Sequence, residues 1–278
     1  MTIREALRLA AARLEQAGVP DADVDAAYLL ASVLKEDTLA MRINGHRELA
    51  APQRAAFDAL CDRRAAREPL QYILGETEFM GLTFHVEPGV LIPRADTEIL
   101  VEKALEWMKP GAQVLDIGTG SGAIAVSLAK LGRQAQVTAV DVSDRALEIA
   151  RQNAKRNGAA VEFVKSDCFS ALKGRKYDMI VSNPPYISED EMRGLMPEVT
   201  REPELALFGG ADGLDFYRRI SREAPEYLNE GGCLLFEIGW LQKDAVSALV
   251  KAHIGEPFAL RDYGQNWRVV GARKEDAC

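Results

Sequence analysis

The chain has 278 residues, 47% of them hydrophobic and 27% charged, which suits a globular protein with one large core or two ordinary ones and excludes a disordered chain. Its formal net charge of -8 disfavours a long surface for duplex nucleic acid. The four cysteines form no CxxC pair and have no histidine at metal-ligand spacing, and no apolar run approaches the roughly 18 residues of a membrane span, so we expect a cytoplasmic protein without a metal or a membrane.

Helical periodicity dominates the first part of the chain. Thr2-Ile3-Arg4-Glu5 has the form of a capping box, and apolar residues then recur every three or four positions as far as Gly18. The same spacing runs through residues 24–34 and 52–63. These patterns predict a small helical bundle, which we assign to an N-terminal domain at residues 1–72.

The next segment has a different pattern. Residues 75–92 interleave aromatic and branched side chains with Gly81 and Gly89, which is typical of short strands and turns. We therefore predict a β-hairpin linker at residues 73–95.

From residue 96 to residue 278, helical and strand patterns alternate. This alternation predicts an α/β domain in which helices cover a mostly parallel, Rossmann-like sheet. The expected helices are 97–108, 122–131, 144–157, 215–228 and 242–252. The expected strands are 112–117, 136–141, 160–165, 177–182, 233–238 and a terminal pair within 257–272. We assign residues 96–278 to the catalytic domain.

A glycine-rich turn follows the first strand of the predicted sheet. The turn consists of Gly118, Thr119, Gly120, Ser121 and Gly122. Its glycines permit positive φ angles and let a ligand approach bare backbone, while the start of the following helix presents unpaired N–H groups. The spacing also satisfies the loose dinucleotide-binding pattern, so the turn alone leaves the ligand open.

Acidic residues near the strand ends favour S-adenosylmethionine over a dinucleotide. Asp116, two residues before the turn, can lie near the cationic amino-acid end of that cofactor and would repel a pyrophosphate. Asp141 closes the second strand, where its oxygens can accept both ribose hydroxyls, and Asp167 closes the third, where a carboxylate suits the adenine amino group. Helix capping would explain either acid alone, but not their shared position at one sheet edge. The cofactor-binding residues expected there are Asp141, Val142, Asp167, Cys168 and Phe169.

In the segment VSNPPYIS at 181–188, Asn183 to Tyr186 follow the fourth strand of the sheet. A planar amino group is a poor nucleophile, and accepting its two hydrogens through the Asn183 side-chain oxygen and the Pro184 carbonyl would orient its nitrogen for attack. Pro184 and Pro185 restrict the backbone that holds this carbonyl, and Tyr186 can pack against the flat face of the substrate. A bare NPPY tetrapeptide is more often a turn. Its place beside a cofactor loop favours a catalytic clamp.

These motifs resemble the S-adenosylmethionine-dependent methyltransferases of planar amino nitrogens, and among them the HemK-type peptide chain release factor glutamine methyltransferases. Three further stretches share the resemblance: EFMGLTFHVEPGVLIPRADTEILV at 78–101, REPELALFGGADGLDFYRRI at 201–220 and RDYGQNWRV at 261–269. The resemblance implies methylation of the side-chain amide nitrogen (N5) of the glutamine in the Gly-Gly-Gln motif of release factors. It also implies that the helical domain recognises the factor.

On matching positions, the resemblance implies that Gly118–Gly122 and Asp141 bind the cofactor and that Asn183–Tyr186 hold the glutamine, with Asn183 serving both ligands. It places Pro93 and Arg94 at the pocket entrance, where the alternative is a capped elbow between domains.

Position 168 differs from some relatives, which have an aromatic residue where this chain has a cysteine. Either Phe169 or aliphatic groups would then lie against the adenine.

Two other functions remain as alternatives. An adenine-N6 methyltransferase of nucleic acid shares NPPY, but it should carry a basic groove and a target-reading insertion, and the sequence shows neither. A non-catalytic adaptor that keeps the fold would need neither NPPY nor Asp141. We expect release factors as the protein partner and no direct binding of nucleic acid.

Overall fold

The computed structural model describes residues 1–274 and separates into two compact units. The first unit comprises Met1–Glu76 and Met196–Arg201, and the second comprises Thr77–Leu195 and the chain from Glu202 onward. In the described part of the chain, no helix combines the length and the apolar character that crossing a membrane requires.

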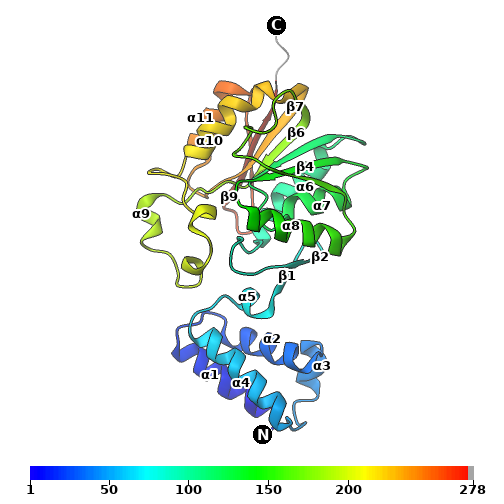
Figure 1. Ribbon diagram of the computed structural model, residues 1–278. Coiled ribbons are helices and arrows are strands. Elements are labelled where there is room, and N and C mark those ends of the chain that lie inside the picture. Colours follow the sequence, from blue (N-terminus) through cyan, green and yellow to red (C-terminus); the bar gives the residue numbers. More distant parts are fainter. Residues whose placement is uncertain (275–278) are drawn as a thin grey trace. The chain divides into compact units, whose positions relative to one another are not determined.

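The first unit is built from helices (Figure 1). They are α1 (Ile3–Gln16), α2 (Ala22–Leu34), α3 (Thr38–Ile43), α4 (Ala51–Ala65) and α5 (Leu70–Leu74). Thr2 and Glu5 form the capping box, in which the Thr2 N–H donates to the Glu5 carboxylate at 2.8 Å. The sequence reasoning missed the short helix α3, which Asp37 caps by accepting from the Leu39 N–H at 2.7 Å. The apolar faces of these helices share one core.

Met196–Arg201 joins the first unit through Glu198. Its carboxylate accepts hydrogen bonds from Arg67 at 2.6 Å and forms an ion pair with Arg64 at 2.8 Å. Arg64 is itself buried and also binds Asp25 at 2.6 Å. Burial acts to raise the pKa of Glu198, but the hydrogen bonds from Arg67 and Arg64 outweigh it and lower the pKa to about 2.

A β-hairpin follows the first helices. It consists of β1 (Glu76–Phe79) and β2 (Leu82–His85). Met80 and Gly81 have φ angles of 52° and 70°, as a tight two-residue turn between twisted strands requires. Asn153 binds β2 by accepting from the His85 N–H at 2.7 Å and donating to the His85 carbonyl at 3.0 Å.

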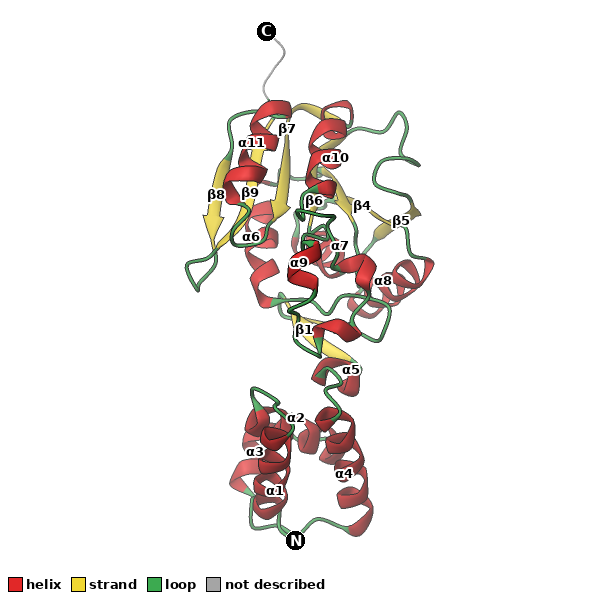
Figure 2. Ribbon diagram, turned by 90° about the vertical axis from the view of Figure 1, so that its left-hand side faces the viewer, coloured by secondary structure: helices red, strands yellow, loops and turns green. Residues whose placement is uncertain are grey.

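The second unit contains a seven-stranded sheet in the order β5-β4-β3-β6-β7-β9-β8 (Figure 2). Its strands are β3 (Gln113–Ile117), β4 (Gln136–Asp141), β5 (Val161–Lys165), β6 (Tyr177–Ser182), β7 (Leu228–Glu237), β8 (Phe258–Arg261) and β9 (Trp267–Arg273). The pairs from β5 to β7 are parallel, whereas β9 runs antiparallel to both β7 and β8. The strand order reverses between β3 and β6, and open α/β sheets bind ligands at the carboxyl ends of strands beside such a reversal.

Helices cover both faces of this sheet (Figures 1 and 2). The helices of the second unit are α6 (Glu98–Trp107), α7 (Ala123–Leu131), α8 (Asp144–Asn157), α9 (Glu189–Met192), α10 (Asp215–Glu223) and α11 (Lys243–His253). Short 3-10 turns lie at η1 (Ala95–Thr97), η2 (Val199–Arg201), η3 (Glu204–Ala206) and η4 (Ala224–Glu226). Residues of α6, α7 and α8 share a core with one face of the sheet, and residues of α10 and α11 share a core with the other.

The predicted fold class, an α/β Rossmann-like sheet with an N-terminal helical bundle and a β-hairpin, is confirmed. The two largest differences from the predicted boundaries adjoin each other, because β7 begins at Leu228 rather than at residue 233 and the helix before it is shorter than the predicted 215–228. The preceding helix α10 ends at Glu223, and Pro225 follows in a 3-10 turn because proline cannot supply the helical N–H.

Candidate active site

A pocket opens in the second unit at the carboxyl ends of the parallel strands. Gly89, Val90 and Leu91 line part of its wall, and Leu205, Ala206 and Phe216 line another part. Of the residues that the sequence singles out, the pocket is lined by Gly118, Gly120, Asp141, Val142, Asp167, Cys168, Asn183, Pro184 and Pro185. The structure thus brings the glycine loop, the acidic strand ends and most of the NPPY segment (Asn183–Tyr186) to one cavity.

The glycines of the loop divide into two kinds. Gly118 and Gly120 have φ angles of +74° and +55°, and a Cβ added at either would meet no atom within 4 Å. Gly122 also has a positive φ, but a Cβ there would lie 3.0 Å from the Cβ of Ala150 in α8. The first two glycines therefore leave room for a ligand beside bare backbone, whereas the third lets α7 and α8 pack closely.

Thr119 and Ser121 lie in the loop without lining the pocket. The Thr119 hydroxyl donates to the Asp116 carboxylate at 2.7 Å, and the Ser121 carbonyl accepts from Asn153 at 2.9 Å. Since Asn153 also binds the backbone of His85, one buried amide ties the loop to the hairpin strand β2.

Asp141 is fixed at the end of β4 by two backbone donors. Its Oδ2 accepts from the Gly120 N–H and its Oδ1 from the Ser143 N–H, both at 2.9 Å. Burial raises the pKa of Asp141, and these backbone hydrogen bonds oppose the rise. Each oxygen retains acceptor capacity toward the pocket, which fits a ligand with two neighbouring hydroxyls.

Asp116 is fully buried under the loop. Its Oδ2 accepts from Thr119, while its Oδ1 has no hydrogen-bond partner among the described residues. Burial raises the pKa of Asp116 to about 7, and the neighbouring Asp141 adds to the rise. Asp116 does not line the pocket, but a buried carboxylate oxygen without a partner is costly, so the position beneath the loop suits a nearby cationic ligand group such as the ammonium of S-adenosylmethionine.

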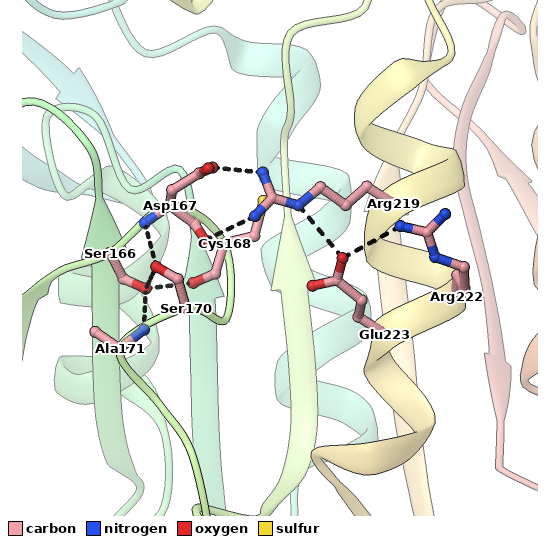
Figure 3. Close-up of polar contacts among 8 residues, drawn as sticks. All are labelled: Ser166, Asp167, Cys168, Ser170, Ala171, Arg219, Arg222 and Glu223. Atoms are coloured by element: carbon pink, nitrogen blue, oxygen red, sulfur yellow. Dashed lines mark hydrogen bonds and ion pairs between the residues drawn. The ribbon is translucent and has the colours of Figure 1, made fainter.

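Arg219 in α10 binds Asp167, which lies just after the end of β5 (Figure 3). Its guanidinium donates to the Asp167 carboxylate at 2.6 Å and to the Asp167 backbone carbonyl at 3.0 Å. The Ser166 hydroxyl donates to the Cys168 carbonyl at 2.8 Å. Together these bonds hold Cys168 at a φ of +49°, a conformation that non-glycine residues rarely adopt.

Phe169 does not line the pocket. Its ring stacks on Tyr227 with centroids 4.4 Å apart, and only 1% of the residue is exposed. The structure therefore leaves Cys168, rather than Phe169, on the pocket wall.

The NPPY segment is held by contacts that the sequence reasoning missed. The Ile187 N–H donates to Leu207, the Gly209 N–H donates to Ile187, both at 2.9 Å, and the Gln242 side chain donates to the Tyr186 carbonyl at 3.0 Å. No described residue donates to the Pro184 carbonyl, so this acceptor is available to a ligand. The double glycine in the stretch at 201–220 was the signal that could have revealed this close packing.

Tyr186 packs on the core that contains α10 and α11 and does not line the pocket. Burial raises the pKa of its hydroxyl to about 12, so the hydroxyl stays protonated at neutral pH.

Pro93 and Arg94 do not line the pocket either. The Arg94 guanidinium forms an ion pair with Glu202, whose second oxygen accepts from the Ile92 N–H at 2.9 Å. Glu202 is 6% exposed, and the sequence reasoning missed it.

Residues 1–274 contain no cluster of three His, Cys, Asp or Glu side chains that could hold a metal ion. Cys61, Cys168 and Cys233 are buried free thiols, and Cys278 lies outside the described residues.

Comparison with known proteins supplies the family. The methyltransferase small domain matches residues 82–201, and the PrmC N-terminal domain matches residues 5–75. A release factor glutamine methyltransferase from Geobacter sulfurreducens is 46% identical and covers 98% of this chain and 96% of its own length. One from Cereibacter sphaeroides is 44% identical and covers 98% of this chain and 99% of its own length.

Two solved structures share the fold of this chain. A methyltransferase from Pyrococcus furiosus has a TM-score of 0.57 at 23% identity, covering 71% of this chain and 91% of its own. A 16S rRNA N2 G1207 methyltransferase from T. thermophilus, in complex with AdoMet and guanosine, has a TM-score of 0.53 at 22% identity, covering 72% of this chain and 50% of its own.

The sheet with its switch point, the glycine loop and the matching domain define an S-adenosylmethionine-dependent methyltransferase. The sequence identities to the two relatives, which extend over nearly the whole chain, narrow this class to one family. The chain belongs to the release factor glutamine methyltransferase family, as the motifs predicted.

Proposed function

We propose that this protein transfers the methyl group of S-adenosylmethionine to the side-chain amide nitrogen (N5) of the glutamine in the Gly-Gly-Gln motif of peptide chain release factors. The main support is one observation: Asn183 and Pro184 line the same pocket as Gly118 and Asp141. A hydrogen-accepting cradle and a cofactor loop therefore open on a shared cavity. Membership of the family supports the choice of substrate.

The cofactor would lie along the glycine loop. When bound, it supplies a methyl group on a cationic sulfur. Gly118 and Gly120 leave room for it, the free acceptor capacity of Asp141 suits its ribose, and the unpaired oxygen of Asp116 suits its ammonium. Cys168 would face the adenine.

The substrate amide would be held by the NPPY segment. The Asn183 side-chain oxygen and the Pro184 carbonyl would each accept one N–H of the glutamine. Two fixed acceptors orient the nitrogen toward the donor and stabilise the positive charge that builds on it during attack. The backbone contacts of Tyr186 and Ile187 keep these acceptors in place. Pro185 would bound the site as an apolar wall, and Tyr186, which does not line the pocket, would support the segment from the core behind it.

The remaining roles are part of the same proposal. Residues 1–72 would recognise the body of the release factor, residues 73–95 would link the domains, and residues 96–278 would carry the catalysis. Pro93 and Arg94 would lie at the entrance for the Gly-Gly-Gln loop. The enzyme would act in the cytoplasm, where release factors work, and it would not bind nucleic acid directly.

The test is mass spectrometry of purified release factors incubated with the protein and isotope-labelled cofactor. We expect one labelled methyl group, located on the motif glutamine, and none on a factor whose motif glutamine is replaced by asparagine. Label on adenine N6 of added DNA or RNA, with none on the factor, would favour the nucleic-acid alternative. Absence of transfer to either, with cofactor bound, would favour the adaptor.

Asn183→Ala separates catalysis from cofactor binding in this assay. Losing one transition-state acceptor should cost about 3 kcal/mol in turnover, which is roughly 100-fold, with cofactor affinity only modestly reduced. Near-normal turnover of the variant would refute the clamp.

A further inference from the structure

Glu237 lies directly behind the NPPY segment. It is the last residue of β7, whose parallel pairing with β6 aligns Phe236 with Ser182 and so puts Glu237 level with Asn183. The side chain is buried, with 1% of the residue exposed, although the strand around it is apolar. Its Oε2 has no hydrogen-bond partner among the described residues. A buried, unsatisfied carboxylate costs stability, so its presence calls for a functional explanation.

The contacts of Asn183 indicate which end of its carboxamide lies toward the Glu237 carboxylate. The Asn183 Nδ2 lies 3.4 Å from the hydroxyl oxygen of Thr97, to which it donates. Thr97 and Asn183 are also the two side chains whose hydrogen-bonding groups lower the pKa of the Glu237 carboxyl, against the larger rise caused by burial. The NH2 end of the Asn183 carboxamide therefore points toward Thr97 and Glu237, and its oxygen points the other way. A carboxylate accepts hydrogen bonds but donates none, so it tolerates only this orientation of the amide.

We propose that Glu237 is a positioning residue that fixes the orientation of the Asn183 carboxamide, so that the amide oxygen is presented to the amino group of the substrate. This inference rests on the proposed function for its catalytic consequence, but the orientation itself does not. If the amide turned over, its NH2 end would meet the NH2 group of the glutamine, and two donors would face each other.

The charged and titratable groups that act on Glu237 come from four different segments of the chain. Asp96 in η1, Arg268 in β9, Tyr186 after β6 and Tyr217 in α10 all interact electrostatically with it. Arg268 is held in place by Asp96 at 2.9 Å and by Asp262 at 3.0 Å.

The three stretches at 78–101, 201–220 and 261–269 each contribute to this surrounding, through Thr97, Tyr217 and Arg268 respectively. None of them contributes a residue of the NPPY segment. Because all three supply residues that surround Glu237, we infer that they share one role, which is to hold the carboxylate next to Asn183.

The protonation state of Glu237 should control the orientation of the Asn183 carboxamide. Burial raises the pKa of Glu237 to about 7, and Asp96 adds to the rise, while Thr97, Arg268 and Asn183 oppose it. Above this value the carboxylate accepts from the Asn183 NH2 group. Below it the carboxyl carries a hydrogen that can be donated to the Asn183 oxygen, and the preference for one orientation weakens.

Glu237→Gln tests the proposal, because glutamine has nearly the same shape but can donate to the Asn183 oxygen. We expect turnover to fall about 10- to 100-fold, as for a misoriented hydrogen-bonding partner, with the KM for the factor and the Kd for the cofactor nearly unchanged. At saturating cofactor, where protonation of Asp116 does not limit binding, the wild-type turnover should fall below pH 7 and this fall should disappear in the variant. In Glu237→Gln/Asn183→Ala, turnover should fall no further than in Asn183→Ala alone, since Glu237 acts through Asn183. Wild-type turnover in Glu237→Gln, or additive losses, would overturn the proposal.

A second readout does not depend on activity. In ¹⁵N-labelled protein, the side-chain NH2 signals of Asn183, identified by their loss in Asn183→Ala, should shift with an apparent pKa near 7. The shift should vanish in Glu237→Gln and also in Glu237→Ala, which serves if the glutamine variant does not fold. Tyr217→Phe should keep the shift, because it removes only a hydrogen bond to the Glu237 backbone carbonyl. If the signals shift but no factor is methylated by the wild type, the proposed function fails and the positioning role stands. If the signals are independent of pH in the wild type, the positioning role fails.

Discussion

Gly209 provides a direct test of how the NPPY segment is positioned. A Cβ added at this residue would lie 2.6 Å from the Pro185 carbonyl oxygen and 2.8 Å from the Tyr186 Cα. Both atoms belong to backbone, so neither can swing away as the end of a flexible side chain could. Gly209→Ala must therefore push aside either the NPPY backbone or the backbone around residue 209 itself.

The size of the displacement follows from these contacts. Ordinary van der Waals contact begins near 3.4 Å, which is about 0.8 Å beyond the position of the added Cβ relative to the Pro185 oxygen. A misplacement of about 1 Å at a reacting group can cost on the order of 100-fold in rate. Overpacking of this kind costs roughly 1 to 3 kcal/mol in the free energy of unfolding. Gly209 does not have a positive φ, so no strain in backbone dihedrals adds to this.

Single-turnover methyl transfer from labelled cofactor measures the expected loss, and calorimetry measures cofactor affinity, which should stay within a few-fold because Gly118 and Asp141 are untouched. Gly194→Ala is the matched control, since a Cβ there would have the Glu191 carbonyl as its nearest neighbour at 3.7 Å. Equal turnover in Gly209→Ala and Gly194→Ala, with both variants folded, would refute the idea that close glycine packing positions the clamp.

Three further predictions concern the cofactor end and the first unit. Asp141→Ala should weaken cofactor binding at least about 100-fold by calorimetry while the fold survives, because two hydrogen bonds to a charged group are lost and each contributes about 1.5 to 3 kcal/mol; unchanged affinity would contradict the ribose assignment. Arg219→Ala should release Asp167 and weaken cofactor binding several-fold. Arg222→Ala should not, because the Arg222 side chain is 67% exposed and does not bind Asp167; equal effects of the two variants would contradict the proposal that Arg219 positions Asp167. The folded pKa of Glu198 is depressed to about 2 from an ordinary 4.5, so its contribution to stability is present above pH 4.5 and is lost as the pH falls toward 2. The difference in unfolding free energy between wild type and Glu198→Gln should therefore shrink between pH 7 and pH 3, and a constant difference would count against the ion pairs with Arg64 and Arg67.

Much of this fold could be predicted because its signals are local in sequence. The alternation of helix and strand patterns, the glycine turn and the capping box at Thr2 each depend on residues within about twenty positions of one another. The short helix α3 was missed because six residues are too few to show a clear periodicity. The first residues of β7 were missed because Asn229 to Gly232 read as a turn and only pairing with β6 extends the strand through them.

The candidate site was predictable only where its residues adjoin a strand end. Asp141 ends a predicted strand and Gly118 and Asn183 each follow one, and the rule that parallel strands end at one edge brings them together. The choice between Cys168 and Phe169 could not be made, because two consecutive residues in an irregular loop give no signal of which one faces a cavity. Stacking on Tyr227, which lies far along the chain, decides it.

The supporting residues reach the site from distant segments, and this explains why pattern reasoning missed them. Arg219 and Gln242 bind residues that follow β5 and β6, and Glu202 binds the backbone of Ile92; these partners lie about 50 to 110 positions away in the chain. Glu237 did leave a signal, since an acid within the apolar run CLLFEI contradicts the usual exclusion of charge from buried strands. A charged residue at the end of a central strand is tolerated only if something offsets the cost of burying it. At the catalytic edge of a parallel sheet, the neighbouring strand end is where to look for that partner, and here it is Asn183.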